Sequence, residues 1–231
     1  MIILKKKRRI IAFAIVTILM FNFSVVQAAG FDAPVPLSKL LIMNLFHDVP
    51  ESHAQYDPIT ELEELGYVIG VGDEYFKPDD MTTRAEFAKM LIFAVGKDEE
   101  AEYKKFFVDV PQEHWASGYI MRAVEVGVVG TDEIGNNEFR PDDYIDRETA
   151  ALWISRAMGV SLEADISAAD ADEITYKSEA ATVLDLGLME LIDNNFLPKE
   201  TFKRSDAAVI IKKVMDEYSE WRYTYEDKEE V

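Results

Sequence analysis

Residues 76 to 87 read Phe76-Lys77-Pro78-Asp79-Asp80-Met81-Thr82-Thr83-Arg84-Ala85-Glu86-Phe87. The pattern returns as Phe139-Arg140-Pro141-Asp142-Asp143-Tyr144-Ile145-Asp146-Arg147-Glu148, and again as Phe196-Leu197-Pro198-Lys199-Glu200-Thr201-Phe202-Lys203-Arg204-Ser205-Asp206. The arginines of the three copies are 63 and 57 positions apart. A repeat of this period indicates an array of similar units of about 50 to 60 residues, each marginally stable alone, which bury their apolar faces against one another.

Each copy lies inside a longer unit. The first two units open with an acidic turn, Phe46-His47-Asp48-Val49-Pro50 and Phe107-Val108-Asp109-Val110-Pro111, and these turns are 61 positions apart. Proline and aspartate suit a turn that enters a helix. A first helix then reaches a glycine, which ends helices readily because it adopts positive φ. The three glycines are Gly66, Gly127 and Gly187.

A second helix follows the arginine in every unit, with apolar residues at i, i+1, i+4 and i+7. This spacing is the stripe of an amphipathic helix. The stripes are Phe87, Ala88, Leu91 and Ala94; Ala150, Ala151, Ile154 and Ala157; and Ala207, Ala208, Ile211 and Val214. Because alanine lets helices approach closely, we expect the three stripes to meet near a common axis. The predicted fold class is all-α, with three helix-loop-helix units.

The amino-terminal residues have the composition of a secretory signal peptide. Residues 5 to 9 are all lysine or arginine, residues 10 to 21 are almost wholly apolar, and Val26-Gln27-Ala28 offers small side chains for cleavage. We therefore expect a signal peptide at 1–28, cut after Ala28. The alternative is an uncleaved membrane anchor, but the apolar segment is shorter than the ~20 residues that span a bilayer.

The chain is acidic and contains no cysteine. Its 231 residues carry a formal net charge of -20, which becomes -25 when the five positive charges of residues 1–28 are removed. A protein this acidic repels nucleic acid and anionic membranes, so neither is an expected partner. Without disulfides, the exported protein must be stable through packing alone.

Several spaced motifs now occur in a fixed order: Phe-x-Asp-Val-Pro, His-Trp-Ala, Tyr-Ile, a helix-ending glycine, Phe-x-Pro and Thr-Arg-Ala-Glu. This order resembles the S-layer homology (SLH) repeat of bacterial cell-surface proteins, over residues 46 to 215. The resemblance implies a pseudo-threefold, three-pronged helical bundle. It also implies noncovalent attachment to the cell wall through an anionic secondary cell-wall polysaccharide, often one that carries pyruvate ketals.

The expected organisation follows from the repeat and the resemblance. A lead segment at 29–45 follows the signal peptide, and an acidic tail at 216–231 ends the chain. The repeats are expected at 46–95 (unit 1), 107–158 (unit 2) and 166–215 (unit 3, degenerate). Unit 3 lacks Asp-Val-Pro and His-Trp-Ala and offers only Asp170-Ala171-Asp172 in their place. Unit 3 therefore either binds the polysaccharide or only completes the helical bundle.

The arginine of the repeat is the leading candidate for ligand contact. Thr83 and Glu86 have the spacing of a capping box, which places Arg84 at the first helical position. A cation there faces the positive end of the helix dipole, at a cost of roughly 0.3 to 1 kcal/mol. Arg147 and Arg204 repeat the arrangement.

Two interactions would each offset the cost of placing arginine at the start of a helix, and they are compatible. One is an ion pair from each arginine to the acidic turn before it, Asp79-Asp80 or Asp142-Asp143. The other is an anion site in which the arginine and free helix N–H groups bind a carboxylate, such as that of a pyruvylated sugar. The resemblance favours the second explanation for Arg84 and Arg147.

Three more residues are candidates for polysaccharide contact. Trp115 either stacks on the apolar face of a sugar or packs in the core at helical spacing. Asp48 and Asp109 either cap helices or bond sugar hydroxyls. Trp153 and Trp221 are interpreted as packing residues. In unit 1, Ala54 stands where unit 2 has Trp115.

The motif census gives no support for catalysis. With three histidines, no cysteine, and no nucleophile or zinc motif, the sequence shows no catalytic residue, cofactor or metal site. Acidic clusters such as Asp79-Asp80 suit calcium in ligand type but lack the EF-hand pattern, so a solvated surface is the preferred interpretation. The alternative function is that of a wall-bound adaptor or structural surface module that acts through a protein partner.

Overall fold

The computed structural model describes residues 46–225, apart from residues 69, 71, 73, 132, 163 and 164, and describes only the backbone of residues 220–225. The helices are α3 (Tyr56–Glu64), α4 (Arg84–Ala94), α5 (Ser117–Glu125), α6 (Arg147–Met158), the 3-10 helix η2 (Ala171–Glu173), α7 (Lys177–Asp185) and α8 (Arg204–Tyr225). The described residues contain isolated β-bridges but no strand, which confirms the all-α class. The expected signal peptide and lead segment lie outside these residues.

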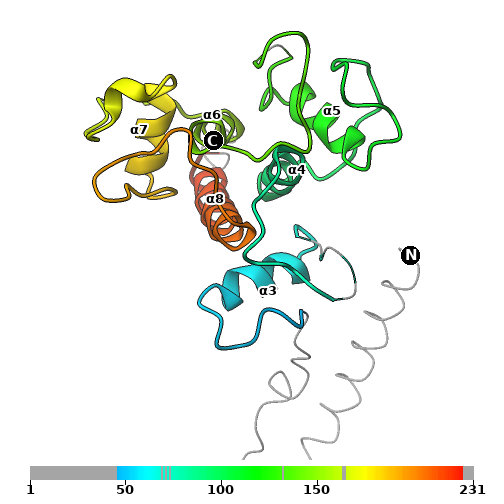
Figure 1. Ribbon diagram of the computed structural model, residues 1–231, viewed down its shortest axis with the longest axis horizontal. Coiled ribbons are helices and arrows are strands. Elements are labelled where there is room, and N and C mark those ends of the chain that lie inside the picture. The colour runs from blue at the N-terminus through cyan, green and yellow to red at the C-terminus, as the bar shows by residue number, and fades with distance from the viewer. Residues whose placement is uncertain are drawn as a thin grey trace, which may run out of the picture. The chain divides into compact units, whose positions relative to one another are not determined.

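The helices are arranged as a centre and three lobes (Figure 1). The second helices of the units, α4, α6 and α8, stand at the centre, and α3, α5 and α7 lie outside them. Each outer helix packs against a central helix of another unit: α5 on α4, α7 on α6, and α3 on α8. The last contact joins unit 1 to unit 3, so the array closes on itself.

The apolar stripes face the centre, as predicted. The innermost residues of the three stripes have no exposed surface; they are Phe87, Ala88 and Leu91, Ala150, Ala151 and Ile154, and Ala207, Ala208 and Ile211. Residues outside the stripes, such as Ile92 and Leu152, are also buried. The lobes cover the outer sides of the central helices, so these helices are apolar around more of their circumference than the stripe alone predicts.

The amino ends of the central helices are joined by backbone hydrogen bonds between units. The amide N–H of Arg84 donates to the carbonyl of Asp143 over 2.8 Å, and the next amide donates to the carbonyl of Pro141. The other two central helices make the equivalent pair of bonds, from unit 2 to unit 3 and from unit 3 to unit 1. The first two helical N–H groups therefore have partners, and the predicted anion site built on free helix N–H groups is wrong in that respect.

Unit 1 also has the predicted capping box. Thr83 accepts from the amide of Glu86, and the Glu86 carboxylate accepts from the amide of Thr83. In unit 2 the cap is Asp146, whose carboxylate accepts from the amide of Thr149. The three helix-ending glycines Gly66, Gly127 and Gly187 have φ values of 80°, 77° and 66°, in the left-handed region that favours glycine.

One carboxylate holds the loop of each lobe. Asp48, Asp109 and Asp170 lie 61 positions apart, and both oxygens of each accept from successive N–H groups of the Phe-x-Pro turn, over 2.6–2.9 Å. The second donor in each pair has φ of 56–58°, an unusual value for a side chain with Cβ. The predicted capping role is wrong, because α3 and α5 have no side-chain cap. Asp170 shows that unit 3 keeps this feature.

Asp170→Asn is expected to destabilise the protein by about 1–3 kcal/mol, because an amide leaves one of the two N–H groups unpaired. Burial raises the pKa of Asp170, but the bonds from Phe196 and Leu197 outweigh it, so the pKa lies below its ordinary value. A lowered folded-state pKa means that the stabilisation is present at neutral pH and is lost as the pH falls through that pKa. Thermal melts at about pH 7 and about pH 2 should show the Tm difference shrinking at the lower pH. A constant difference would contradict this role.

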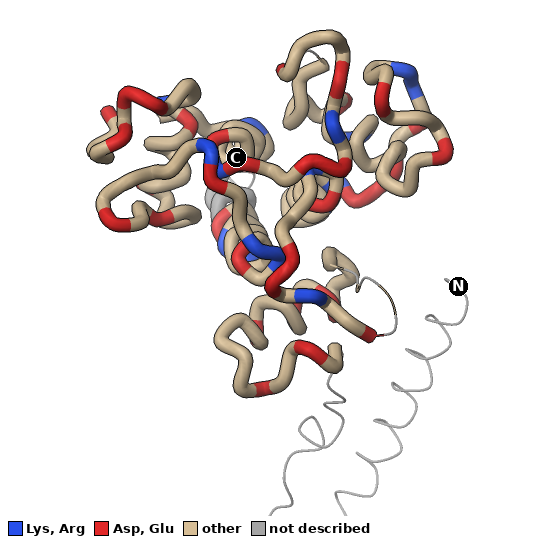
Figure 2. Tube along the Cα trace, in the orientation of Figure 1, with Lys and Arg blue, Asp and Glu red and all other residues tan. Residues whose placement is uncertain are grey.

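Helix α8 continues past residue 215, where the sequence placed the end of unit 3. It reaches Tyr225, because residues 216–225 contain neither glycine nor proline to end it. None of the helices in the described part of the chain is long and apolar enough to span a membrane. Acidic residues are spread over all three lobes (Figure 2), and no cluster of them among the described residues has the makings of a metal site.

Candidate functional site

The three repeat arginines are buried and link the units in a ring. Each is 6–8% exposed. The Nε of Arg84 donates to the carbonyl of Phe139 over 2.8 Å, and that of Arg147 to Phe196 over 2.6 Å. Arg204 completes the ring with a bond of 2.9 Å to the carbonyl of Phe76. Each arginine thus ties its unit to the Phe-x-Pro turn of the following one.

The guanidinium groups also lie over aromatic rings. Arg84 is 5.3 Å from the centroid of Phe139 and 4.8 Å from that of Trp153, and the other two arginines lie 4.8–5.2 Å from the equivalent phenylalanines. Burial lowers the pKa of Arg84 and Arg147, although arginine remains charged. Among the described residues, neither Arg84 nor Arg147 forms an ion pair with the acidic turn of its own unit. The ion-pair explanation is therefore wrong for these two.

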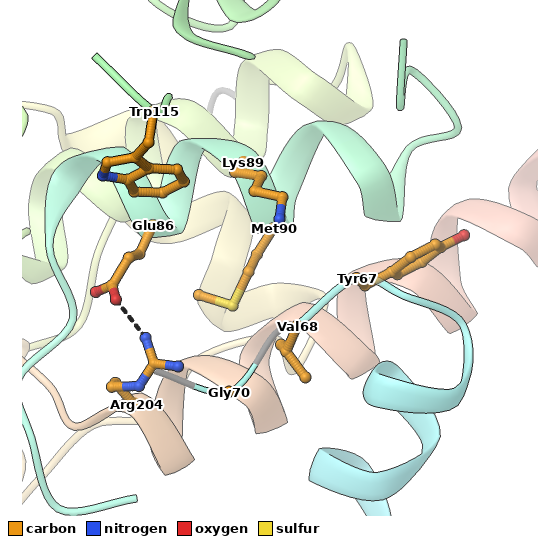
Figure 3. A pocket seen from close by; sticks show the side chains of 8 residues that line it. All are labelled: Tyr67, Val68, Gly70, Glu86, Lys89, Met90, Trp115 and Arg204. Atoms are coloured by element: carbon orange, nitrogen blue, oxygen red, sulfur yellow. Dashed lines mark hydrogen bonds and ion pairs between the residues drawn. The ribbon is translucent and has the colours of Figure 1, made fainter. Parts of the chain in front are cut away.

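One pocket of about 340 Å³ combines residues from all three units (Figure 3). It is lined by Tyr67, Val68, Gly70, Glu86, Lys89, Met90, Trp115 and Arg204. Trp115 and Arg204 lie on opposite sides, and Glu86 lies between them. We call this site the Trp115 pocket.

The pocket pairs Trp115 with a different arginine from those the sequence favoured. Arg204, from unit 3, lines it, whereas Arg84 and Arg147 do not. Trp115 precedes α5 instead of lying within it and is 55% exposed, so its interpretation as a core residue is wrong. Trp153, by contrast, is fully buried, as predicted. The side chain of Trp221 lies outside the described residues.

The pocket has more positive than negative side chains, in a chain whose net charge is -20. Arg204 forms an ion pair with Glu86, which also belongs to the capping box. Lys89 supplies the second cation, with its Nζ 5.4 Å from the Phe93 centroid and 5.2 Å from the Tyr119 centroid. Arg204 therefore offers positive charge on the side opposite the exposed indole face, and Lys89 adds a second cation from α4.

A second groove, of about 420 Å³, is built around Arg147 at the equivalent place in unit 3. Val209 stands there where the Trp115 pocket has Lys89. Unit 1 contributes Gln55, the residue after Ala54, which is the equivalent of Trp115. The Arg147 guanidinium also donates to the carbonyl of Glu190 over 2.7 Å. This groove has a second cation, Lys213, but its one aromatic residue, Phe202, is only 6% exposed, so it lacks an exposed aromatic face.

Sequence reasoning missed Lys89 and Tyr67 in this pocket. A signal existed for Lys89, because the equivalent positions in the other second helices are Leu152 and Val209, both apolar. A cation that replaces an apolar residue in only one of three copies indicates a role specific to that unit. Tyr67 gave no such signal, since apolar or aromatic residues follow the helix-ending glycine in every unit.

Comparison with known proteins identifies the family. The model of the S-layer homology domain matches residues 45–88 and 106–151. The chain carries S-layer homology domains. The two matches cover most of units 1 and 2. Unit 3 repeats three features of these units, in Asp170, Gly187 and Arg204.

Curated relatives agree with the SLH assignment. A cell surface protein of Thermoanaerobacter kivui is 28% identical over 92% of this chain and 25% of its own length. The S-layer protein sap of Bacillus anthracis is 29% identical over 81% of the chain and 23% of its own length. An endoglucanase of a Bacillus species is 30% identical over 78% of the chain and 20% of its own length. The SLH chain thus spans about a quarter or less of these relatives' lengths, and it is a secreted protein of the cell surface or wall.

Proposed function

We propose that this SLH protein attaches noncovalently to the bacterial cell wall by binding an anionic secondary cell-wall polysaccharide in the Trp115 pocket. The observation that carries the proposal is the exposed indole face of Trp115 opposite Arg204, with Lys89 as a second cation in the same pocket. No other described groove combines these features.

The aromatic face accounts for sugar binding. The apolar face of a pyranose ring packs on an indole, and Trp115 is exposed while it is held at the start of α5 by the turn that precedes it. His114 fixes that turn, because its Nδ1 accepts from the amide of Ala116 over 3.1 Å. The platform is thus ordered before a ligand arrives, which lowers the entropic cost of binding.

The cations account for selectivity toward an anionic glycan. A carboxylate, such as that of a pyruvate ketal, can bind a guanidinium or ammonium group at this wall of the pocket. Because the Arg204 pair with Glu86 is largely shielded from water, it holds the guanidinium in a fixed orientation for a ligand. The chain as a whole is acidic and repels anions. An anionic glycan is therefore expected to bind at the cationic pocket in preference to the rest of the surface.

Pelleting with purified wall sacculi tests the function. The mature protein is expected to sediment with intact sacculi from a bacterium whose wall carries a pyruvylated polysaccharide. It is expected to remain in solution after hydrofluoric acid has removed that polymer. Equal binding to stripped peptidoglycan would overturn the polysaccharide proposal, and sedimentation with neither would overturn wall attachment.

A further inference from the structure

Arg84, the repeat arginine that lines neither groove described above, stands in unit 1 at the place that Arg204 has in unit 3. Trp153 stands 63 positions after Met90, so the two share one place on their central helices. The Arg84 cluster is defined by Arg84 and the two rings that its guanidinium lies over, those of Phe139 and Trp153. It therefore combines an arginine with an indole, as the Trp115 pocket does.

A carboxylate of the chain itself lies in this cluster. One oxygen of Glu133 accepts from the amide of Gly130 over 2.6 Å and from the guanidinium of Arg156. The other oxygen accepts from the indole Nε1 of Trp153 over 2.9 Å. Three donors on a carboxylate whose side chain is only 13% exposed make a well-formed carboxylate site.

The same carboxylate acts on Arg84. The Arg84 guanidinium lies over the ring of Trp153, whose indole N–H holds Glu133. Burial lowers the pKa of Arg84, and Glu133 is the foremost of the charges that raise it in return. Gly130 leaves room for this arrangement, because a Cβ there would come within 3.0 Å of the Glu133 side chain. Glu133 and Arg84 are therefore linked through Trp153, which bonds the first and lies under the second.

We propose that the Arg84 cluster is a second carboxylate-binding site for the wall polysaccharide, and that Glu133 occupies it as an internal ligand. In the unmodified protein only the Trp115 pocket is open, so each chain binds one acidic sugar. Displacement of Glu133 opens the second site. The glycan part of this proposal rests on the proposed function, whereas the occupied carboxylate site does not.

Acetate tests the carboxylate site without any glycan. Glu133→Ala leaves the Gly130 amide, the Trp153 indole and Arg156 without their acceptor. Sodium acetate is expected to raise the Tm of this variant by several degrees more than sodium chloride of equal ionic strength, because it binds only the folded state. The unmodified protein and the control Glu138→Ala should show only the smaller acetate response of the open Trp115 pocket. Glu138 is an acid of the same loop region, paired with the exposed Arg140. Equal responses of all three proteins would overturn the internal-ligand proposal.

Calorimetric titration tests whether the opened site takes the sugar. The probe is a methyl hexopyranoside with a 4,6-pyruvyl ketal, and the same glycoside without the ketal is its control. We expect one site in the unmodified protein, two in Glu133→Ala, and one in the double variant Trp115→Ala/Glu133→Ala. One site in the folded Glu133→Ala variant, or two in the unmodified protein, would overturn the second glycan site.

Two precautions keep the outcomes distinct. Where Glu133→Ala fails to fold, Glu133→Gln removes the charge while it keeps one acceptor oxygen, and the same site count is measured on it. Where the unmodified protein binds no ketal, the proposed function fails, and the acetate experiment still decides whether Glu133 fills a carboxylate site.

Discussion

Arg84→Ala is expected to lower the free energy of unfolding by about 3 kcal/mol, because Arg84 holds two units together. The variant loses a buried bond to the Phe139 carbonyl and the packing of the guanidinium on Trp153. A hydrogen bond to a charged group contributes about 1.5–3 kcal/mol, and a desolvated cation over a ring adds about 2 kcal/mol. In a domain of this size the Tm should fall by about 10 °C.

The control is Arg140→Ala, which removes an arginine from the neighbouring turn. Arg140 is paired with Glu138 but half-exposed, and exposed pairs contribute about 0–1 kcal/mol. Arg84→Lys separates charge from geometry, because lysine keeps the charge but lacks the planar group that both bonds and stacks. It should recover little of the lost stability. An Arg84→Ala protein with an unchanged Tm and lost sacculus binding would contradict the structural role.

The repeat made the fold predictable, because each unit carries its own local signals. The glycine that ends the first helix, the capping box at Thr83 and the apolar stripe at Phe87 all act within one unit. Local signals of this kind depend on neighbours in sequence, and so they can be read from it. The capping box and the buried stripe are both present in the structure.

The site was less predictable, because its residues come from different units. Trp115 of unit 2 meets Lys89 of unit 1 and Arg204 of unit 3 only after the array has closed through the contact of α3 with α8. From the sequence, an arginine is a better candidate for ligand contact the more closely its own unit matches the repeat. That ranking disfavoured Arg204, whose unit is degenerate but whose guanidinium reaches the turn of the best preserved unit.

The hydrogen bonds that side chains form within the fold could not be predicted from the sequence either. Asp48 and Asp109 looked available for sugar hydroxyls, yet each carboxylate is bound to two amides about 30 positions away. Trp115, by contrast, has the spacing of a buried helical residue with Tyr119 but is available to a ligand. It precedes the helix, since α5 begins only at Ser117. Spacing alone cannot distinguish a residue just outside a helix from one inside it.

Trp115→Ala is expected to weaken binding of the ketal-bearing glycoside about 30-fold, which corresponds to about 2 kcal/mol for a central aromatic contact. Its Tm should remain close to that of the unmodified protein, because the side chain is 55% exposed. Calorimetric titration gives the affinity, and a thermal melt gives the stability of the same sample. Trp115→Phe should retain part of the affinity, since the smaller ring still offers an apolar face.

Tyr144→Ala is the matched control, since Tyr144 is an exposed aromatic residue, at 58%, that does not line the pocket. It should bind the glycoside as the unmodified protein does. Equal losses in both variants would indicate a general surface effect, and an unchanged affinity in Trp115→Ala would remove the pocket from the proposal. Arg204→Lys completes the comparison: it keeps the positive charge opposite Trp115 but cannot form the bidentate contact that a guanidinium offers a carboxylate. Loss of affinity for the ketal, with the weaker binding of the plain glycoside unchanged, would therefore assign the carboxylate to Arg204 and the sugar ring to Trp115.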